Sequence, residues 1–362
     1  MRKILLVIDG MADSPYKELQ GKTPLEAART PTLDFLASKS KCGLVWPIKG
    51  IAPESGEAQF VLLGYPLTLY PGRGVLEALG AGIKIKPKNL YFRANLAQVR
   101  GNKIVNLRVN FSKISRLLKK INEINKDIKV FPTVGYRAVV VVENGKLPVS
   151  NTHPGYIRYK NYSKAVSRAL VLHWCNGHKA TCEKINSFLK AFLKITGDKT
   201  LLLRGASYGK LPKIRKMKNW AFIGDMPIEA GLAKLAGMKI LKREKNEIRQ
   251  ILHEKENVYV QIKGPDVFGH RGDVFGKIKA IEAIDKMLQP LGSLVKLKKL
   301  KDTILCITSD HATSCKLKRH TSGAVACMIY GKRKTDKVQK FNEKECSKGF
   351  MAEGKNLMKL LK

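Results

Sequence analysis

Six residues of this chain, three aspartates and three histidines, are candidate ligands for metal ions. They are Asp9, Asp266, His270, Asp310, His311 and His320. Asp266 stands four residues before His270, a spacing that can bring a carboxylate and an imidazole to one ion, and Asp310 is next to His311. Mixed oxygen and nitrogen ligands suit Mn, Zn, Co or Fe better than Ca. Taken singly, each is more often a cap or an ordinary core or surface residue than a metal ligand, so the prediction depends on their lying together.

Ser55, in "PESGEAQFVLLGY", is a candidate nucleophile and also a candidate helix cap. Serine is a favoured N-cap because its hydroxyl accepts a hydrogen bond from a backbone N–H of the first turn. A helix N-terminus also attracts phosphate through its free amides and its dipole. A serine hydroxyl attacks phosphorus only when a base or a metal removes its proton. With metal ligands expected nearby, we predict that Ser55 is the nucleophile.

A second set of possible ligands occurs in "HWCNGHKATC", which contains His173, Cys175, His178 and Cys182. A Cys2His2 zinc site is the alternative interpretation of this segment. The order and the gaps do not match a zinc finger or knuckle, and a helical pattern follows directly. We therefore favour the aspartate and histidine set as the metal centre.

The elements that would position those residues are strands of a mostly parallel sheet. The runs "KILLVIDG", "VYVQIKGPD" and "TILCITSDH" are apolar and each leads into an acidic residue. Parallel strands deliver polar groups at their carboxyl ends, which lie along one edge of the sheet. Helical periodicity follows the second run at 278–288. The pattern predicts the α/β class.

The middle of the chain follows a different plan. It has a strand-like run at 91–99, helical patterns at 112–124, 165–172 and 185–193, and a pair of strands with a hairpin turn at Asn144-Gly145. The strands that lead into acidic residues lie on both sides of this block. We therefore expect a core domain formed by 1–88 and 217–362, interrupted by an inserted α+β domain at 89–216.

The amino-acid composition limits the classes of binding partner that we expect for this chain. Lys and Arg total 68 against 29 Asp and Glu, a net charge of +39, which favours anionic ligands. The basic residues are scattered rather than gathered in one stripe, so nucleic acid is not the expected partner. No apolar run approaches the roughly 20 residues of a membrane span. Seven cysteines without secretory features indicate reduced thiols and a cytoplasmic protein. No oligomeric state is predicted.

Motifs along the whole chain resemble the archaeal-type cofactor-independent phosphoglycerate mutases of the alkaline phosphatase superfamily. They are "IDGMAD", "GKTPLEAARTPTLDFLA", "PESGEAQFVLLGY", "YPGRGVLEALGAG", "YFRANLAQV", "GYRAVVVV", "LLLRGA", "DVFGHRGDVFGKIKAIEAID", "SDHATSCKLKRH" and "FNEKECSKGFMAEGKNLM". The resemblance implies an alkaline-phosphatase-like core with a substrate-binding cap. It also implies two groups of metal ligands. One ion would be held by Asp266, His270 and His320, and the other by Asp9, Ser55, Asp310 and His311.

The chain departs from that family in several places. Gly56 stands where an aspartate usually follows the serine, and 106–111 keep one of three arginines, Arg108. The segment 239–256 also matches poorly. The candidate substrate clamps are Arg93, Arg108, Arg137 and Arg204, since guanidinium matches carboxylate and phosphate in a fork geometry. Solvated surface arginines are the alternative interpretation in so basic a chain.

The predicted function is interconversion of 3-phosphoglycerate and 2-phosphoglycerate through a phosphoserine on Ser55. The cofactors would be two divalent ions, manganese first and Mg, Zn or Co as alternatives, without 2,3-bisphosphoglycerate. Closure of the cap would exclude water and retain glycerate. The alternatives are a metal-dependent phosphatase or phosphotransferase acting on another small phosphate ester, and a non-catalytic nucleic-acid-binding relative.

Overall fold

The computed structural model of the chain describes residues 1–159, 162–166, 168–332 and 335–362. It divides the chain into two compact units. The first unit comprises 1–68, 216–225 and 236–362, and the second comprises 69–215 and 226–235.

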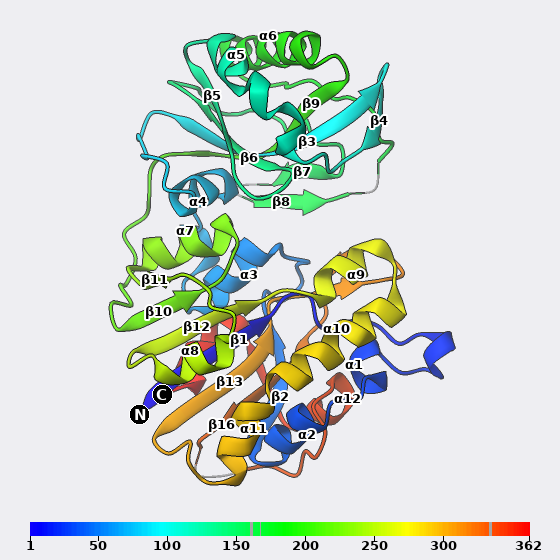
Figure 1. Cartoon of the computed structure of the whole chain (residues 1–362), viewed down its shortest axis with the longest axis vertical. Helices are drawn as coiled ribbons and strands as arrows, with labels where there is room; N and C mark the ends of the chain where they lie inside the picture. Colours follow the sequence, from blue (N-terminus) through cyan, green and yellow to red (C-terminus); the bar gives the residue numbers. More distant parts are fainter. Residues whose placement is uncertain (160–161, 167, 333–334) are drawn as a thin grey trace. The chain divides into compact units, whose positions relative to one another are not determined.

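The first unit is built on an eight-stranded sheet (Figure 1). Its strands, in spatial order, are β11 (Lys239–Leu241), β10 (Trp220–Ile223), β12 (Asn257–Ile262), β1 (Arg2–Ile8), β13 (Thr303–Ser309), β16 (Val325–Tyr330), β2 (Ser40–Trp46) and β17 (Phe350–Glu353). All neighbours from β11 to β13 are parallel, β16 is antiparallel to β13 and β2, and β17 is parallel to β2. This mostly parallel sheet confirms the α/β prediction.

Helices cover this sheet with apolar side chains. They are α1 (Pro24–Ala27), α2 (Pro31–Ser38), α3 (Ser55–Leu62), α8 (Glu247–His253), α9 (Pro265–Arg271), α10 (Val274–Met287), α11 (Gln289–Lys296), α12 (Glu343–Cys346) and α13 (Leu357–Leu360), with 3₁₀ turns η1 (Lys17–Leu19), η2 (Leu67–Leu69) and η4 (Gly354–Asn356). Ile281, Ile284 and Leu288 are buried in the main core, as their 3.6-residue spacing predicts. A separate small ribbon pairs β14 (Ala312–Ser314) with β15 (Arg319–Thr321).

The second unit contains an antiparallel sheet centred on β3 (Leu90–Arg100). Its other strands are β4 (Lys103–Asn106), β5 (Ile128–Pro132), β6 (Arg137–Val142) and β9 (Lys199–Tyr208), and β7 (Tyr156–Tyr159) pairs with β8 (Tyr162–Ala165). The helices are α4 (Arg73–Gly80), α5 (Leu118–Glu123), α6 (Lys179–Thr196) and α7 (Pro227–Ala236), with the 3₁₀ turn η3 (Phe111–Leu117) before α5. The helix expected at 185–193 is the central part of α6.

The boundaries of the second unit differ from those expected, because α4 and α7 belong to it. Val75 and Ala78 of α4 pack against Tyr91 and Val139 of the sheet. The two helices touch through glycines: a Cβ added at Gly80 would lie 1.8 Å from the carbonyl oxygen of Pro227. Helices that approach this closely tolerate no side chain at the contact. Residues 69–88 and 226–235 are thus parts of the second unit.

Two local predictions in the second unit are wrong. Asn144 has the positive φ of a turn, 51°, but no strand returns along β6 after it. Both edges of β6 are already paired, with β3 and β5. No helix forms in the described residues of 165–172, because Ala165 ends β8 and residues 170–172 bond to the 102–104 turn. Ser167 lies outside the described residues.

Within the part of the chain that the structure describes, every helix is too short or too polar to cross a membrane.

Candidate metal centre

Three neighbouring strands of the first unit end in polar side chains at one edge. Ile8, the last residue of β1, is paired with Ile262 of β12 and with Ser309 of β13. The residues that follow those positions are Asp9, Lys263 and Asp310. Parallel strands in register place their carboxyl ends side by side, and the backbone N–H of Gly10 donates to Asp310 Oδ1 at 3.1 Å. The register of the sheet therefore builds the base of the site.

Gly10 allows the loop after β1 to lie against the other ligand-bearing segments. Its φ is +60°, and an added Cβ would lie 2.8 Å from the Cβ of Asp266 and 2.5 Å from Oγ1 of Thr313. The backbone N–H of Asp266 donates to the carbonyl oxygen of Asp9 at 3.1 Å. The first turn of α9 is thereby joined to the end of β1.

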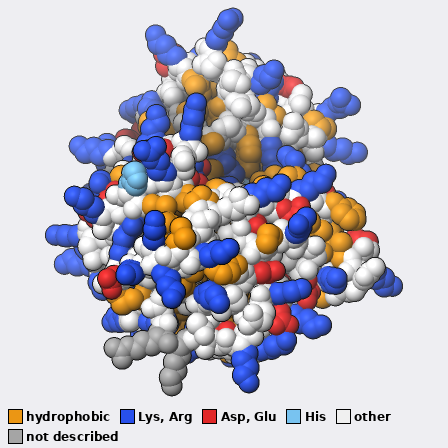
Figure 2. All heavy atoms as spheres, turned by 60° about the horizontal axis from the view of Figure 1, so that its bottom comes forward, with side chains coloured by type: hydrophobic (Ala, Val, Ile, Leu, Met, Phe, Trp, Pro, Cys, Tyr) orange, Lys and Arg blue, Asp and Glu red, His pale blue; other side chains and the backbone are white. Residues whose placement is uncertain are grey.

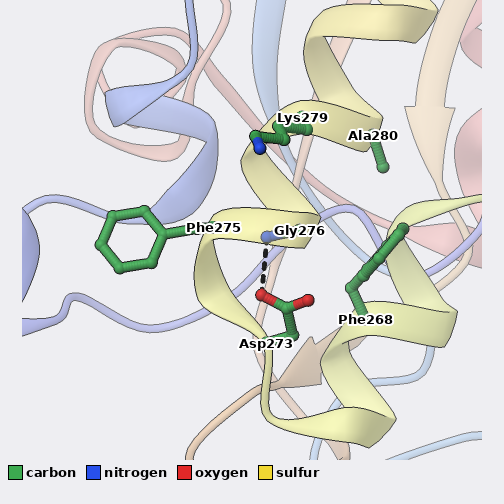
Figure 3. Close-up of a pocket in the computed structure, with 6 residues that line it drawn as sticks. All are labelled: Phe268, Asp273, Phe275, Gly276, Lys279 and Ala280. Atoms are coloured by element: carbon green, nitrogen blue, oxygen red, sulfur yellow. Dashed lines mark hydrogen bonds between the residues drawn. The ribbon is translucent and has the colours of Figure 1, made fainter.

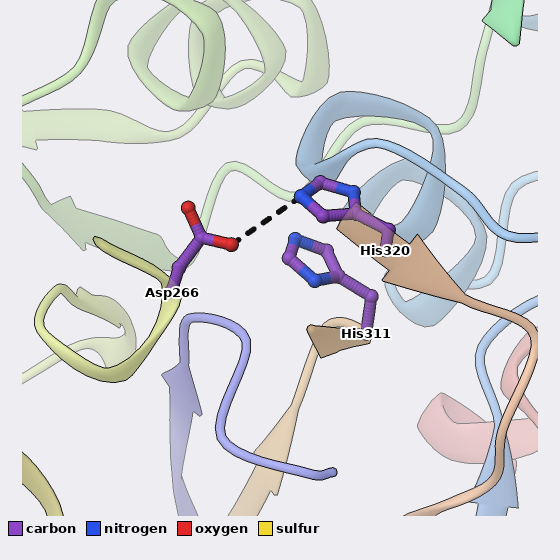
Figure 4. Close-up of side chains that lie close together, drawn as sticks. All are labelled: Asp266, His311 and His320. Carbon is purple, nitrogen blue, oxygen red and sulfur yellow. Dashed lines mark ion pairs between the residues drawn. The ribbon is translucent and has the colours of Figure 1, made fainter. Parts of the chain in front are cut away.

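Asp266, His311 and His320 form one group of close potential ligands (Figure 4). His320 Nε2 lies 3.3 Å from Asp266 Oδ1, and the rings of His311 and His320 stack with centroids 3.7 Å apart. His270 adjoins this group, with Nε2 3.5 Å from Asp266 Oδ1 and 3.1 Å from His320 Nε2. The structure thus brings His270 and His320, fifty residues apart in the sequence, to the same carboxylate.

The hydrogen bonds of His270 and His320 direct their Nε2 atoms toward the site. Nδ1 of His270 lies 3.0 Å from the carbonyl oxygen of Lys318, and Nδ1 of His320 lies 2.7 Å from that of Pro53. A carbonyl only accepts, so each Nδ1 carries a proton, and in the neutral ring Nε2 then presents its lone pair. Two such lone pairs 3.1 Å apart beside a carboxylate fit a bound cation. The donor set, nitrogen and oxygen without sulfur, suits Mn, Zn or Co.

Asp9, Asp310 and His311 form the second group. Nε2 of His311 lies 3.3 Å from Asp9 Oδ1 and 3.6 Å from Asp310 Oδ2. Oγ of Ser55 lies 3.5 Å from Asp9 Oδ1 and 3.2 Å from His311 Nε2. The four residues expected to share an ion are therefore adjacent. His311 lies within reach of both groups, whereas the family resemblance implied that it serves only one.

The charges of this group perturb one another strongly. Burial alone would raise the pKa of Asp9, but Lys263, with Nζ 2.8 Å away, and His311 outweigh burial and lower that pKa to about 2. Burial disfavours protonated His311, yet Asp310 and Asp9 raise its pKa to about 9. Burial raises the pKa of Asp310. In the metal-free protein a proton on His311 thus offsets part of the negative charge of the two carboxylates.

Ser55 is not the N-cap of α3. Glu54 occupies the cap position with extended backbone, and Ser55 is the first helical residue. The hydroxyl of Ser55 is directed instead to Asp9 and His311, as the two distances above show. The cap interpretation is therefore wrong in this structure, and the hydroxyl lies among the candidate ligands at a helix N-terminus.

Three residues that support the ligands were not identified from the sequence. Lys263 directly follows β12, so the argument from strand ends would have found it. Oγ1 of Thr313 donates to Asp266 Oδ1 at 2.8 Å and lies 3.1 Å from His311 Nδ1, which links the two ligand groups. Nε2 of the buried Gln59 donates to Asp310 Oδ2 at 2.9 Å. The last two give no signal in the sequence, because their contacts depend on packing between distant segments.

A cluster of arginines in the second unit surrounds Glu77. Arg93 on β3 is paired with Arg204 on β9, and Arg137 on β6 is paired with Asn95 of β3, so the register of the sheet brings three arginines together. Arg93 donates to both carboxylate oxygens of Glu77, at 2.8 and 3.0 Å. Burial, together with repulsion from Arg73, Arg204 and Arg137, outweighs the attraction of Glu77 and lowers the pKa of Arg93 to about 10. Such a concentration of guanidinium groups fits an anionic ligand.

Arg108 differs from the other three predicted clamps. It is exposed and lies 5.6 Å from the ring centroid of Tyr136, on which Arg137 also packs at 4.9 Å.

Glu77 and Arg73 were not predicted as site residues. Arg73 donates to Glu77 at 2.8 Å from the preceding turn of α4, an i,i+4 pair that the motif "GRGVLEALG" contains.

The alternative zinc site does not assemble. Sγ of Cys175 and Sγ of Cys182 are 2.9 Å apart, but His178 accepts from the N–H of Thr181 as the N-cap of α6. Among the described residues, the two groups of potential metal ligands are those of the first unit.

An open pocket of about 510 Å³ lies beside α9 and α10 (Figure 3). It is lined by Phe268, Asp273, Phe275, Gly276, Lys279 and Ala280. In Figure 3 the carboxylate of Asp273 is turned to the backbone of Gly276, which it caps at 2.7 Å. The pocket shares α9 with the ligand groups but none of their residues, so we place the chemistry at the ligands.

Comparison with known proteins finds relatives that match most or all of the chain. The family model described as 2,3-bisphosphoglycerate-independent phosphoglycerate mutase matches residues 37–201. The 2,3-bisphosphoglycerate-independent phosphoglycerate mutase of Methanopyrus kandleri is 30% identical over 100% of this chain and 96% of that protein. The probable mutase of the same description from Thermosipho africanus is 34% identical over 96% of this chain and 89% of that protein.

Two solved structures are similar over nearly the whole chain. The cofactor-independent phosphoglycerate mutase of Thermoplasma acidophilum has 26% identity and a TM-score of 0.60, covering 99% of this chain and 98% of that one. A protein of Pyrococcus horikoshii has 24% identity and a TM-score of 0.80, covering 99% and 96%, and shares the fold.

Proposed function

Because the chain belongs to the 2,3-bisphosphoglycerate-independent phosphoglycerate mutase family, we propose that it interconverts 3-phosphoglycerate and 2-phosphoglycerate through a phosphoserine on Ser55. The observation that carries the proposal is the position of Ser55 Oγ. It lies 3.5 Å from Asp9 Oδ1 and 3.2 Å from His311 Nε2, among six candidate metal ligands. A hydroxyl so placed is suited to become a nucleophile.

The ligand groups would hold two divalent ions, one at Asp266, His270 and His320 and one at Asp9, Asp310 and His311 with Ser55. When bound, such ions neutralise phosphoryl oxygens and lower the pKa of a coordinated hydroxyl. Thr313 and the carbonyl oxygens of Pro53 and Lys318 keep the three imidazoles oriented. Lys263 adds a positive charge next to Asp9. These residues favour a dianionic phosphoryl group at Ser55.

The reaction balances over two transfers. Ser55 Oγ forms a bond to phosphorus while the bond from phosphorus to the C3 oxygen breaks, and that oxygen takes up a proton. The C2 hydroxyl of the retained glycerate then loses its proton and attacks the phosphoserine, which frees Ser55. Water must be excluded between the two steps, since it would release inorganic phosphate.

We assign recognition of the carboxylate and the phosphate to the arginines around Glu77. Arg137 is half-buried and packs on Tyr136, and Arg204 lies 3.8 Å from the ring centroid of Tyr156. Planar guanidinium groups held on aromatic faces are oriented for bidentate contacts with an anion. These arginines select phosphoglycerate over simpler phosphate esters, which need only the metal ligands and Ser55.

Phosphorus NMR tests the reaction directly. Protein incubated with 3-phosphoglycerate and Mn, without added 2,3-bisphosphoglycerate, should produce the signal of 2-phosphoglycerate until equilibrium. Ser55→Ala serves as the inactive control. Inorganic phosphate as the sole new signal would show a phosphatase, and no new signal with metal-loaded protein would reject both activities.

The role of the arginines is tested by comparing two substrates. Arg137→Ala should reduce turnover of 3-phosphoglycerate at least about 100-fold more than hydrolysis of an aryl phosphate, because only the first reaction needs glycerate held and reoriented. Arg116→Ala is the matched control, an exposed arginine on η3 of the same unit. Equal losses in the two assays would remove Arg137 from the clamp.

A further inference from the structure

Two cysteines of the second unit are in direct contact. Cys175 lies in the loop before α6 and Cys182 lies in the first turn of that helix. Their Sγ atoms are 2.9 Å apart, compared with 3.8 Å for Cys306 and Cys327 in the first unit. A disulfide bond measures about 2.05 Å, so a movement of roughly 1 Å would join the two sulfurs.

Hydrogen bonds between Asn186 and the backbone of Cys175 hold the two thiols close together. Asn186 lies one turn after Cys182 on α6 and therefore on the same face of the helix. Its Oδ1 accepts from the N–H of Cys175 at 2.8 Å, and its Nδ2 donates to the carbonyl oxygen of Cys175 at 3.0 Å. Both backbone groups of Cys175 are thus held to α6, which places its side chain next to Cys182.

The contact lies at the base of a long loop. The N–H of His178 donates to the carbonyl oxygen of Pro148, and that of Ser150 donates to Asn176, both at 2.7 Å. The loop between these paired ends carries Tyr156, whose ring faces the guanidinium of Arg204 at 3.8 Å. A covalent bond between Cys175 and Cys182 would fasten the base of this loop to α6.

We propose that Cys175 and Cys182 are a site of intramolecular disulfide formation. The oxidant is a low-molecular-weight disulfide. One protein thiolate attacks it, forms a mixed disulfide and releases one small thiolate. The second protein thiolate then attacks the protein sulfur of that bond and releases the other small thiolate. Two protein thiols are oxidised, one small disulfide is reduced to two thiols, and the two protons pass to the released thiolates.

Burial explains when the bond would form and why it would persist. Cys175 is 2% exposed and Cys182 is 5% exposed. Burial, together with the neighbouring thiol, raises the pKa of Cys175, which slows attack by its thiolate in the folded protein. Oxidation is therefore fastest in the unfolded chain, and folding then buries the bond away from reductants. This inference does not depend on the proposed reaction.

Peptide mapping tests the proposal. Full-length protein is refolded in a buffer of oxidised and reduced glutathione, alkylated under denaturing conditions and digested with trypsin, which cuts after Lys179, between the two cysteines. We expect the peptide containing Cys175 to be linked to that containing Cys182, while the other five cysteines are alkylated. Full alkylation of both cysteines at every glutathione ratio would overturn the proposal.

The effect on stability is compared with and without reductant. Wild-type protein should unfold a few °C higher without reductant, and Cys182→Ser should show no such difference. Cys306→Ser, the matched control, should keep the full difference. A rise that persists in Cys182→Ser, or that disappears in Cys306→Ser, would place the bond elsewhere and contradict the assignment.

Discussion

At the scale of single residues, the proposed mechanism depends on Ser55. It begins α3 without capping it, so the helix does not need its hydroxyl. The hydroxyl instead contacts Asp9 and His311 at the carboxyl edge of the sheet. Its position fits the proposed role of nucleophile and is not needed to cap the helix.

Ser55→Ala should therefore remove activity and preserve the fold. Without the nucleophile, turnover of 3-phosphoglycerate should fall by roughly 10⁴-fold or more. The free energy of unfolding should change by less than the about 1 kcal/mol typical of a lost N-cap, because Glu54 occupies that position. A coupled enolase assay and urea denaturation measure the two quantities. Mutase activity within tenfold of wild type would exclude Ser55 as the nucleophile.

Glu77 supplies the negative charge that pairs with the buried arginines of the second unit. Its side chain is fully buried and bonds to Arg73 and Arg93. Burial alone would raise its pKa, but the surrounding arginines outweigh burial and lower the pKa below the ordinary value. A carboxylate with a depressed pKa stabilises the fold above its unfolded pKa of about 4.5, and that contribution is lost as the pH falls through the folded value.

Glu77→Gln should cost about 3–5 kcal/mol of unfolding free energy at pH 7, because it leaves buried guanidinium groups without their counter-charge. The cost should shrink as the pH is lowered from 4.5, where Glu77 becomes protonated in the unfolded chain, and should be least below the depressed folded pKa, where wild-type Glu77 is itself protonated. Glu143→Gln, which removes an exposed partner of Lys86, is the control and should cost less than about 1 kcal/mol. Denaturation of all three proteins at pH 7 and at a series of acidic pH values that extends below the folded pKa of Glu77 measures this. A cost for Glu77→Gln that does not change with pH would refute the assignment.

At the scale of elements, the positions of strands along the chain were predicted better from the sequence than the pairing of one strand with another. Apolar runs that lead into Asp9, Asp266 and Asp310 identified three parallel strands, because a strand buried on both faces and its polar end are both local signals. The hairpin at Asn144 failed because the pairing of β6 depends on β3 and β5, which lie elsewhere in the chain. Glu77 and Thr313 were not predicted as site residues, because their partners are determined by packing between segments that are distant in the sequence.

A buried lysine joins the segments that carry the ligands. Lys277 of α10 is fully buried and donates to the carbonyl oxygen of Ala12, to Asp13 Oδ2 and to the carbonyl oxygen of Thr313, at 3.0, 3.0 and 2.6 Å. Asp13 also accepts from the N–H of Cys315 at 3.1 Å. The pair thus connects the loop after Asp9 to the ribbon after His311.

Lys277→Met should destabilise the protein by about 3–5 kcal/mol, since it leaves a buried carboxylate uncompensated. The double variant Lys277→Met with Asp13→Asn should recover part of the loss. Both should weaken Mn binding about 10-fold or more, because the ligand-bearing loops are no longer held together. Asp285→Asn, on the same helix but capping α2, should leave Mn affinity unchanged. Titration calorimetry measures the affinity, and wild-type affinity in the double variant would contradict this role.

At the scale of the whole molecule, the two units differ in chemistry. All six candidate metal ligands belong to the first unit, and the arginines around Glu77 belong to the second. The net charge of +39 is not gathered in one patch on the face seen in Figure 2, where lysines and arginines are spread among other side chains. Anion recognition is therefore expected at the buried arginines rather than over the surface at large.

Removal of metal should loosen the first unit locally. With the ions gone, the carboxylates of Asp9 and Asp310 face each other across His311 without full compensation. Hydrogen exchange after chelation should accelerate in 9–13, 264–271 and 310–320, and β3 and β9 of the second unit should be unaffected. Added Mn should reverse the change. Equal acceleration in both units, or none in either, would contradict the assignment of the ligands.

The most direct test of the account is to find the phosphoryl group on Ser55. Active, metal-loaded protein is mixed with 3-phosphoglycerate that carries labelled phosphate, quenched in acid and digested, and the phosphopeptides are sequenced by mass spectrometry. Phosphoserine survives acid, so the account predicts label on the peptide containing Ser55, and none in Ser55→Ala. Label on a different residue, or turnover with no labelled peptide under conditions where the intermediate accumulates, would contradict it.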